Sequence, residues 1–329
     1  MKKILFIFIL FTFSILSFSQ INLFSYSDVD YNTFTNNPEN TIVLNLNQGN
    51  LELIKQNKPC EFELNVPFFN NEILKLKLHS FDVYTSDFQL IRSSDNGLVT
   101  ENYSPKIMSY RIIGENVSGT ISFLENNIIA IIKYNQTVYE LKGEKDGLYV
   151  LFDISDSVKP YNFECQTEDI DIDIPTDNTQ NNNTSTECVE MGIDTDYYTF
   201  LEFNNNCYNV VEWALAVLVG VSEIYMFELE EEVLLQAKYV NVRENEDNYY
   251  NLNDCSDMLD ELGDYWTSNP LNTLQNEVDL VHLFTRKQAN GGVAWLDAFC
   301  QNQWKYGVSS GLNTNLNYDY PDNTPYSYN

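Results

Sequence analysis

The sequence predicts a protein in two parts, a β-rich part followed by a mixed α/β part, with a polar segment between them. Before residue 165 the apolar residues come in short runs separated by turn sequences such as Asp95-Asn96-Gly97. After residue 187, strand-like runs alternate with stretches whose apolar residues recur at helical spacing. Residues 165–187 are rich in acids, asparagine and threonine and have almost nothing to bury, which predicts an exposed linker.

Eight strands are expected in the first part, and the short turns between them indicate hairpins. They are residues 41–47, 60–68, 73–84, 108–114, 119–125, 128–135, 137–143 and 148–153. No cluster of catalytic residue types lies among them. The pattern therefore predicts a β-rich domain that carries no chemistry of its own.

The second part is expected to form a largely parallel sheet flanked by helices, because strands and helices alternate along it. One helix is predicted at 206–227, and a second begins after the N-cap Asp254 and ends at Asn269-Pro270. The predicted strands are residues 189–196, 232–242, 279–285, 291–299 and 306–310.

Residues 1–20 have the features of a secretory signal peptide: two lysines, an apolar run, and a small and polar exit. A membrane anchor is the alternative, but the run is short and no basic flank follows it. The apolar run at 213–221 is too short to span a bilayer, so no membrane span is expected after signal cleavage. We therefore expect a secreted or cell-surface protein. Its net charge of −30 argues against nucleic acid as a partner.

Six cysteines in an exported chain favour disulfides over metal thiolates. They are Cys60, Cys165, Cys188, Cys207, Cys255 and Cys300. The sequence alone does not select one pairing.

Most motifs of known catalytic chemistry are absent or incomplete. Residues 307–311, GVSSG, fit the letters of a nucleophile elbow, but no helix is predicted after the serine and both histidines lie upstream of it. No H-E-x-x-H motif occurs, and His79 and His282 each lie in a strand-like run, where a lone histidine is more often a core residue than a ligand. The acids at 168–173 lack the spacing of a calcium loop and favour a solvated spacer.

One short strand has an unusual beginning. In NGGVAWLDAFC, residues 290–300, two glycines precede the apolar residues and leave the start of the strand without side chains. This indicates that another backbone comes close there. An ordinary edge strand, kept short to avoid aggregation, is the alternative. The candidate binding residues are Gly291, Gly292, Val293, Ala294 and Trp295.

The stretch DLVHLFTRKQANGGVAWLDAFCQNQWKYGVSSGLN, residues 279–313, resembles the reprolysin-like zinc metalloproteases, the adamalysin branch of the metzincins, in their secreted bacterial form. VEMGIDTDYYTFL is similar to their opening strand, NVVEWALAVLVGVSEIY to their first long helix, and the β-rich part to their propeptide. The resemblance implies a β-rich propeptide domain followed by an incomplete mixed α/β zincin-like (metzincin) domain. Its expected parts are a signal peptide (1–20), a propeptide-like domain (21–164), a linker (165–187) and a partial metalloprotease domain (188–329).

In that family a substrate peptide lies beside the strand that corresponds to 291–295, as an added strand. The resemblance therefore implies a peptide or protein substrate. Zinc is expected for the complete family member, but its three histidines and general-base glutamate would follow Asn329, so no zinc-binding or catalytic residue is expected in this chain. A secreted protein that binds a peptide or polymer without cleaving it is the alternative. The resemblance also leaves Cys300 without its usual partner, and it makes a zinc-covering thiolate at Cys165 conceivable.

Overall fold

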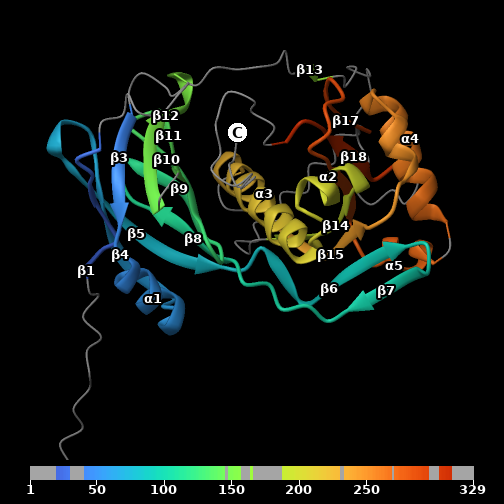
Figure 1. Cartoon of the computed structure of the whole chain (residues 1–329), viewed down its shortest axis with the longest axis horizontal. Coiled ribbons are helices and arrows are strands. Elements are labelled where there is room, and N and C mark those ends of the chain that lie inside the picture. The colour runs from blue at the N-terminus through green and yellow to red at the C-terminus, as the bar shows by residue number, and fades with distance from the viewer. Residues whose placement is uncertain are drawn as a thin grey trace, which may run out of the picture.

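The computed structural model describes residues 20–29, 41–144, 147–156, 164–165, 187–229, 233–268, 270–295 and 304–312. Residues 1–19 of the predicted leader, 166–186 of the predicted linker, and Cys300 lie outside these ranges. The described residues form two sheets with one long helix between them (Figure 1).

The first sheet contains ten strands within the described residues, and most neighbouring strands are antiparallel. In pairing order they are β1 (Gln20–Asn22), β4 (Glu61–Pro67), β5 (Ile73–Phe81), β8 (Met108–Ile113), β9 (Val117–Phe123), β10 (Ile128–Tyr134), β11 (Thr137–Gly143), β12 (Leu148–Asp153), β3 (Thr41–Leu46) and β2 (Phe24–Tyr26). One of its faces carries a separate apolar core, which includes Leu64, Leu76 and Ile121 and is joined by helix α1 (Gln48–Asn57).

The second sheet contains eight strands within the described residues. In pairing order they are β13 (Glu164–Cys165), β17 (Gly291–Ala294), β18 (Tyr306–Ser309), β16 (Leu280–Phe284), β14 (Glu187–Thr195), β15 (Val233–Arg243), β6 (Tyr84–Ser94) and β7 (Gly97–Glu101). The five strands from β18 to β6 are parallel to one another, whereas β17 runs antiparallel to β18. The predicted largely parallel sheet is therefore present.

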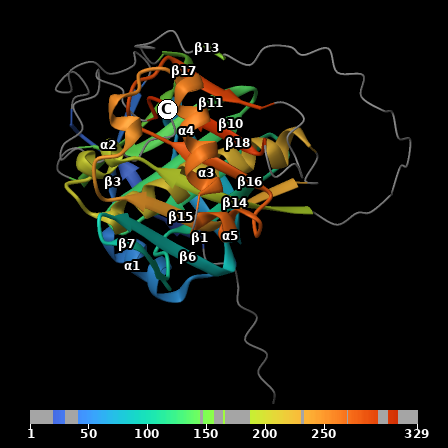
Figure 2. The ribbon, with the colours of Figure 1, turned by 90° about the vertical axis from the view of Figure 1, so that its right-hand side faces the viewer.

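Helices cover both faces of the second sheet. Helix α3 (Cys207–Glu228) begins at Asn206, whose side chain accepts the N–H groups of Tyr208 and Asn209. On the other face, α4 (Cys255–Thr267) follows the predicted N-cap Asp254 and lies in front of the sheet in Figure 2. Two short helices are added: α2 (Tyr197–Glu202) shares the core of α3, and α5 (Leu271–Gln275) shares the core of α4.

The predicted boundary between the two parts does not separate the two sheets. The hairpin β6–β7 comes from the first part of the sequence, yet β6 pairs with β15 in the second sheet, with Leu90 opposite Val240. In Figure 1 this hairpin extends beneath α3 from one sheet to the other. The eight strands predicted for the first part all form, but the predicted division into a propeptide-like domain and a partial protease domain stays a prediction.

Candidate functional site

The five candidate residues lie on and just after β17. Strand β17 pairs with β18 in an antiparallel register that sets Val293 opposite Val308. The predicted strand 291–299 is regular only as far as Ala294, and residues 296–299 lie outside the described ranges. Burial falls along the strand: Gly291 is buried, Val293 is half-buried, and the side chain of Trp295 is 38% exposed.

The other side of β17 is partly occupied by the chain itself. The two-residue strand β13 runs parallel to β17 and places Glu164 opposite Gly291 and Cys165 opposite Gly292. Among the described residues, no strand pairs with Val293 or Ala294 on this side. Within the described part of the chain, the outer edge is therefore covered at the two glycines and unpaired beyond them.

The directions of the backbone N–H and C=O groups of β17 determine which of them face the outer edge. Gly291 accepts a hydrogen bond from the N–H of Ser310 (2.9 Å), and the N–H of Trp295 donates to the carbonyl at the start of β18 (3.4 Å). Backbone groups alternate in an antiparallel ladder, so Gly292 and Ala294 point theirs away from β18. Among the described residues, β13 reaches only as far as Gly292, and none of them pairs with the N–H and C=O of Ala294, which could bond an added strand.

The first glycine has a conformational role that the sequence reading did not anticipate. Asn290 and Gly291 have positive φ angles of 66° and 119°, and the second of these is a conformation that side chains disfavour. The side chain of Ser310 fixes the turn, because its Oγ lies 2.6 Å from the carbonyl oxygen of Gly291. Gly291 is therefore required by the turn that begins β17, whereas Gly292 lies on the paired edge.

An apolar groove of about 490 Å³ opens beside this edge, between the C-terminal half of α3 and the second sheet. Leu218, Val221 and Tyr225 form its helical wall, and Ala294 and Trp295 border it. Figure 1 shows α3 next to the strands of the second sheet. The groove gives the candidate edge an apolar neighbourhood, which suits contact with peptide side chains.

The two histidines do not form a metal site. His282 lines the groove, its Nε2 lies 3.0 Å from the Oγ of Ser309, and burial lowers its pKa to about 4. His79 lies in the first sheet, with its Nδ1 3.1 Å from Glu61. Within the described ranges, no group of three or more His, Cys, Asp or Glu side chains could hold a metal ion. These residues therefore do not fit the zinc that the family uses.

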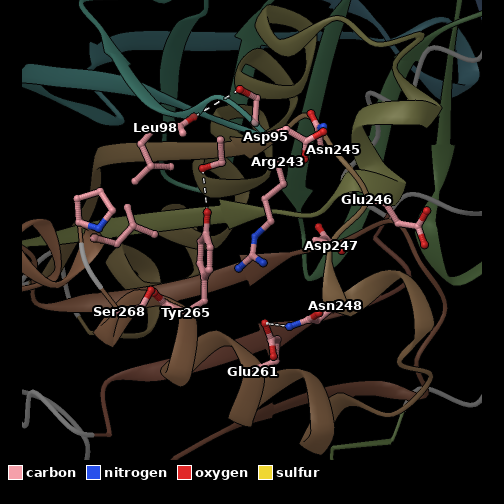
Figure 3. Close-up of a pocket in the computed structure, with 15 residues that line it drawn as sticks. Asp95, Leu98, Arg243, Asn245, Glu246, Asp247, Asn248, Glu261, Tyr265 and Ser268 are labelled. Atoms are coloured by element: carbon pink, nitrogen blue, oxygen red, sulfur yellow. Dashed lines mark hydrogen bonds between the residues drawn. The ribbon is translucent and has the colours of Figure 1, made fainter.

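A second pocket, of about 350 Å³, lies at the carboxyl ends of β6 and β15 and beneath α4 (Figure 3). Arg243 lies at its centre. The guanidinium Nη2 of Arg243 donates to Asp194 Oδ2 (2.6 Å) and to the hydroxyl of Tyr249 (2.8 Å), and the ring of Tyr265 lies 3.5 Å from the guanidinium carbon. This arrangement neutralises and fixes the arginine.

Further polar groups connect this pocket to the sheet interior. The amide of Asn241 donates to Asp194 (2.6 Å), and Asn241 in turn accepts the hydroxyl of Ser93 (2.6 Å). Beside them, burial raises the pKa of Asp247 to about 6, although Arg243 opposes the shift. Sequence reasoning missed this network. The available signal was the presence of Asn241 and Arg243 in the last five residues of β15, which are all buried.

The predicted disulfides are not seen among the described residues. Cys60, Cys188, Cys207 and Cys255 are free thiols there. Cys255 is buried against the turn before β17, with its Sγ 2.9 Å from the carbonyl oxygen of Ala289. This thiol packs against the start of the candidate edge.

The class defined by these features is an α/β protein in which an antiparallel strand, β17, forms one side of a mostly parallel sheet. Residues 214–323 match the family model of the Metallo-peptidase family M12B Reprolysin-like. The match begins within α3 and includes β15, β16, β17 and β18. The resemblance drawn from residues 279–313 is therefore confirmed, and this segment is reprolysin-like. Family M12B is zinc-dependent.

Solved structures give only distant matches. Metalloproteinase-II from Bacteroides fragilis is 8% identical with a TM-score of 0.45, and the match covers 79% of each chain. A chaperone–substrate complex is 7% identical with a TM-score of 0.30, covering 55% of this chain and 25% of the other. TM-scores this low support no conclusion about fold or chemistry. No curated protein matches the sequence.

The described residues include one helix that is long and apolar enough to cross a membrane, Cys207–Met226 within α3. In the fold, 67% of the most apolar stretch of this helix is buried. It lies between the two sheets (Figure 1), where a helix that is apolar on all sides is expected.

Proposed function

We propose that this chain is an exported protein of the reprolysin type of zinc metalloendopeptidases that lacks the H-E-x-x-H helix and does not cleave peptides on its own, and that the outer edge of β17 holds the substrate peptide. The family match over residues 214–323 supports the class of enzyme. One observation supports the location: Ala294 directs its backbone groups to an edge that no described strand occupies. A peptide added there would be bonded through its main chain, which suits substrates of varied sequence.

The described residues supply peptide binding and not the metal chemistry. His282 is a single partly buried imidazole next to Ser309, and His79 is on the other sheet. Zinc, where a family member binds it, acidifies a water molecule and polarises the peptide carbonyl. We assign neither role to a residue of this chain. The part played by β17 is to align the peptide backbone.

The strand β13 limits access to this edge. It pairs with Gly291 and Gly292, which are the first two positions that an incoming peptide would cover. A peptide that used the full length of β17 would have to displace Glu164 and Cys165. We therefore expect peptide binding to strengthen when the backbone pairing of β13 is broken, for example by Glu164→Pro, because the residue opposite the inward-facing Gly291 directs its N–H toward β17.

The substitution Ala294→Pro tests the edge directly. Proline removes the outward N–H of Ala294 and leaves the bonds of Gly291 and Trp295 with β18 in place, and an edge strand tolerates proline. Ala294→Ser is the matched control, because it keeps the N–H. We expect Ala294→Pro to weaken binding of fluorescently labelled, denatured casein about 5- to 10-fold, as the loss of one hydrogen bond implies, and Ala294→Ser to leave it unchanged. Equal binding by both variants would place the peptide elsewhere.

The alternative function is a secreted protein that binds a peptide or polymer without cleaving it. It is favoured by the lack of a metal-binding group among the described residues. Reading the gene beyond the codon for Asn329 separates the two functions, because an open frame that encodes H-E-x-x-H supports the enzyme. A second measurement uses the purified chain with added zinc. Under both functions, added zinc is expected to change neither the melting temperature of the chain nor the casein, because the sequence has only two histidines and they lie on different sheets. Cleavage of casein would show that the catalytic site has been missed.

Export is also part of the proposal. It is supported by the leader-like residues 1–20, the last of which, Gln20, is the first residue of β1. Mass spectrometry of the N-terminus of protein collected from the culture medium tests it. A mature chain that begins near Gln20 or Ile21 is the expected result, and a chain confined to the cytoplasm with Met1 intact would contradict export.

A further inference from the structure

Helix α3 has apolar side chains on all sides and is covered from two directions. Its residues Trp213, Leu215 and Val219 are fully buried. They share one core with residues of the second sheet, such as Val240, and with residues of the first part of the sequence, such as Ile129. A helix of this kind requires cover on each side. The first sheet therefore covers the face of α3 that the second sheet leaves open.

A buried carboxylate on α3 bonds the first part of the chain. Glu212 is 5% exposed, and its Oε1 accepts the hydroxyl of Tyr103 and the N–H of Lys106, both at 2.7 Å. Its Oε2 accepts the N–H of Ile107 at 2.9 Å. Burial raises the pKa of Glu212, and these three hydrogen bonds oppose the shift. Separation of the two parts would leave this carboxylate without any of these partners.

A second charged contact between the two parts of the chain lies further along α3. Arg111 of β8 lies 3.0 Å from Glu223 of α3, and both side chains are largely buried. Each half thus contributes one member of a shielded ion pair. Breaking such a pair costs more than breaking an exposed one, because each charge remains partly buried.

The hairpin β6–β7 extends the contact into the second sheet. Strand β6 pairs with β15 from Gln89 to Ser93, and Ser93 donates to the buried side chain of Asn241. At the end of the same strand, Arg92 bonds Glu244 through two nitrogens, at 2.6 and 3.2 Å. Without this hairpin, β15 would present an unpaired edge next to the Arg243 pocket.

We propose that residues 41–156 and residues 187–312 form a lasting interface, so that the two halves remain one non-covalent complex after the segment between them is cut. The partner that covers α3 and pairs with the edge of β15 is the N-terminal half of this chain. That half is a structural subunit and not a segment released on processing. This inference is independent of the proposed function, because it uses no residue of the β17 edge.

The test begins with a site for a sequence-specific protease inserted between Pro175 and Thr176 of the full chain. After complete cleavage, both fragments are expected to elute from a size-exclusion column together, at the position of the uncut protein, at micromolar concentration. They are also expected to unfold in one thermal transition. Separate elution of the fragments under native conditions, whether or not either stays folded, would overturn the proposal.

A pair of acid-to-amide variants tests the contact itself. Glu212→Gln keeps the side-chain size but replaces one accepting oxygen with an NH2 group, which cannot serve the same donors. It is expected to lower the melting temperature of the cut protein more than that of the uncut protein, because cutting makes the contact intermolecular. Asp260→Asn, on the exposed side of α4, is the matched control and should lower neither. Equal shifts for Glu212→Gln before and after cutting would contradict the interface.

Discussion

The guanidinium of Arg243 and the carboxylate of Asp194 form an ion pair of 2.6 Å at the carboxyl ends of two neighbouring parallel strands, and both side chains are almost fully buried. The rings of Tyr249 and Tyr265 lie 4.1 and 3.5 Å from the guanidinium carbon. Arg243 therefore links β14, β15 and α4 around the pocket of Figure 3. We therefore expect this pair to stabilise this end of the sheet.

Replacement of the arginine should be strongly destabilising. Arg243→Met leaves Asp194 buried without its counter-ion, so the free energy of unfolding is expected to fall by about 3–5 kcal/mol. Arg92→Met is the control, since Arg92 is 38% exposed in its pair with Glu244 and its loss should cost about 1 kcal/mol or less. Urea denaturation followed by circular dichroism measures both. Equal losses for the two variants would be incompatible with this view of the pair.

Two glycines should respond in opposite directions to alanine. A Cβ at Gly192 of β14 would lie 2.8 Å from the ring of Trp266, so Gly192→Ala is expected to lower the free energy of unfolding by about 1–3 kcal/mol. A Cβ at Gly263 of α4 would meet Tyr306 at an ordinary 3.6 Å. Gly263→Ala should therefore raise stability by up to about 1 kcal/mol through helix propensity. A neutral Gly192→Ala would show that β14 and α4 are packed less closely than described.

The carboxyl group of Asp247 should make the protein less stable as the pH rises through the weakly acidic range. Burial raises its pKa from 3.8 to about 6, helped by Asp196 and opposed by Arg243. Between these values the native state holds a proton that the unfolded chain has lost, so this contribution to stability falls from pH 4 to pH 6 and is flat above. Denaturation at several pH values, compared with Asp247→Asn, isolates the effect. A difference between the two proteins that does not change with pH would rule it out.

The imidazole of His282 should have the opposite effect and make the protein more stable as the pH rises through the weakly acidic range. Burial lowers its pKa from 6.5 to about 4, so below pH 6.5 the unfolded chain binds a proton that the native state does not. This contribution to stability is complete above pH 6.5 and is lost as the pH falls toward 4. We expect His282→Gln to be less sensitive to acid over this range than the unchanged protein. The proton resonances of the imidazole give a direct check, and a titration midpoint near 6.5 would contradict the burial.

Much of the second part could be predicted from the sequence, because its signals are local. Asn206 and Asp254 cap the two main helices, and Pro270 follows the end of the second one. The hairpin β6–β7 was different. The turn at Asp95-Asn96-Gly97 was recognised, but the partner of β6 is β15, about 150 residues away in the sequence, and no local pattern identifies it. Helix α1 was also missed, since only Leu51 and Ile54 are buried in it.

The candidate edge could be predicted only in part, again because contacts between residues far apart in the sequence leave no local pattern. The glycines indicated a close backbone approach, and at Gly292 a neighbouring backbone is present, that of β13. The positive φ of Gly291 depends on Ser310 and could not be inferred from the run of letters around it. The Arg243 network was hidden because the chain contains 48 acidic residues, so no single one of them, Asp194 included, stood out.

Amide hydrogen exchange at Ala294, measured with and without an unstructured casein peptide, tests the central claim most directly. The account predicts that the N–H of Ala294 becomes protected when the peptide binds, whereas the N–H of Trp295, already bonded to β18, changes little. Binding of the peptide with no added protection at Ala294 would show that the outer edge of β17 does not hold it.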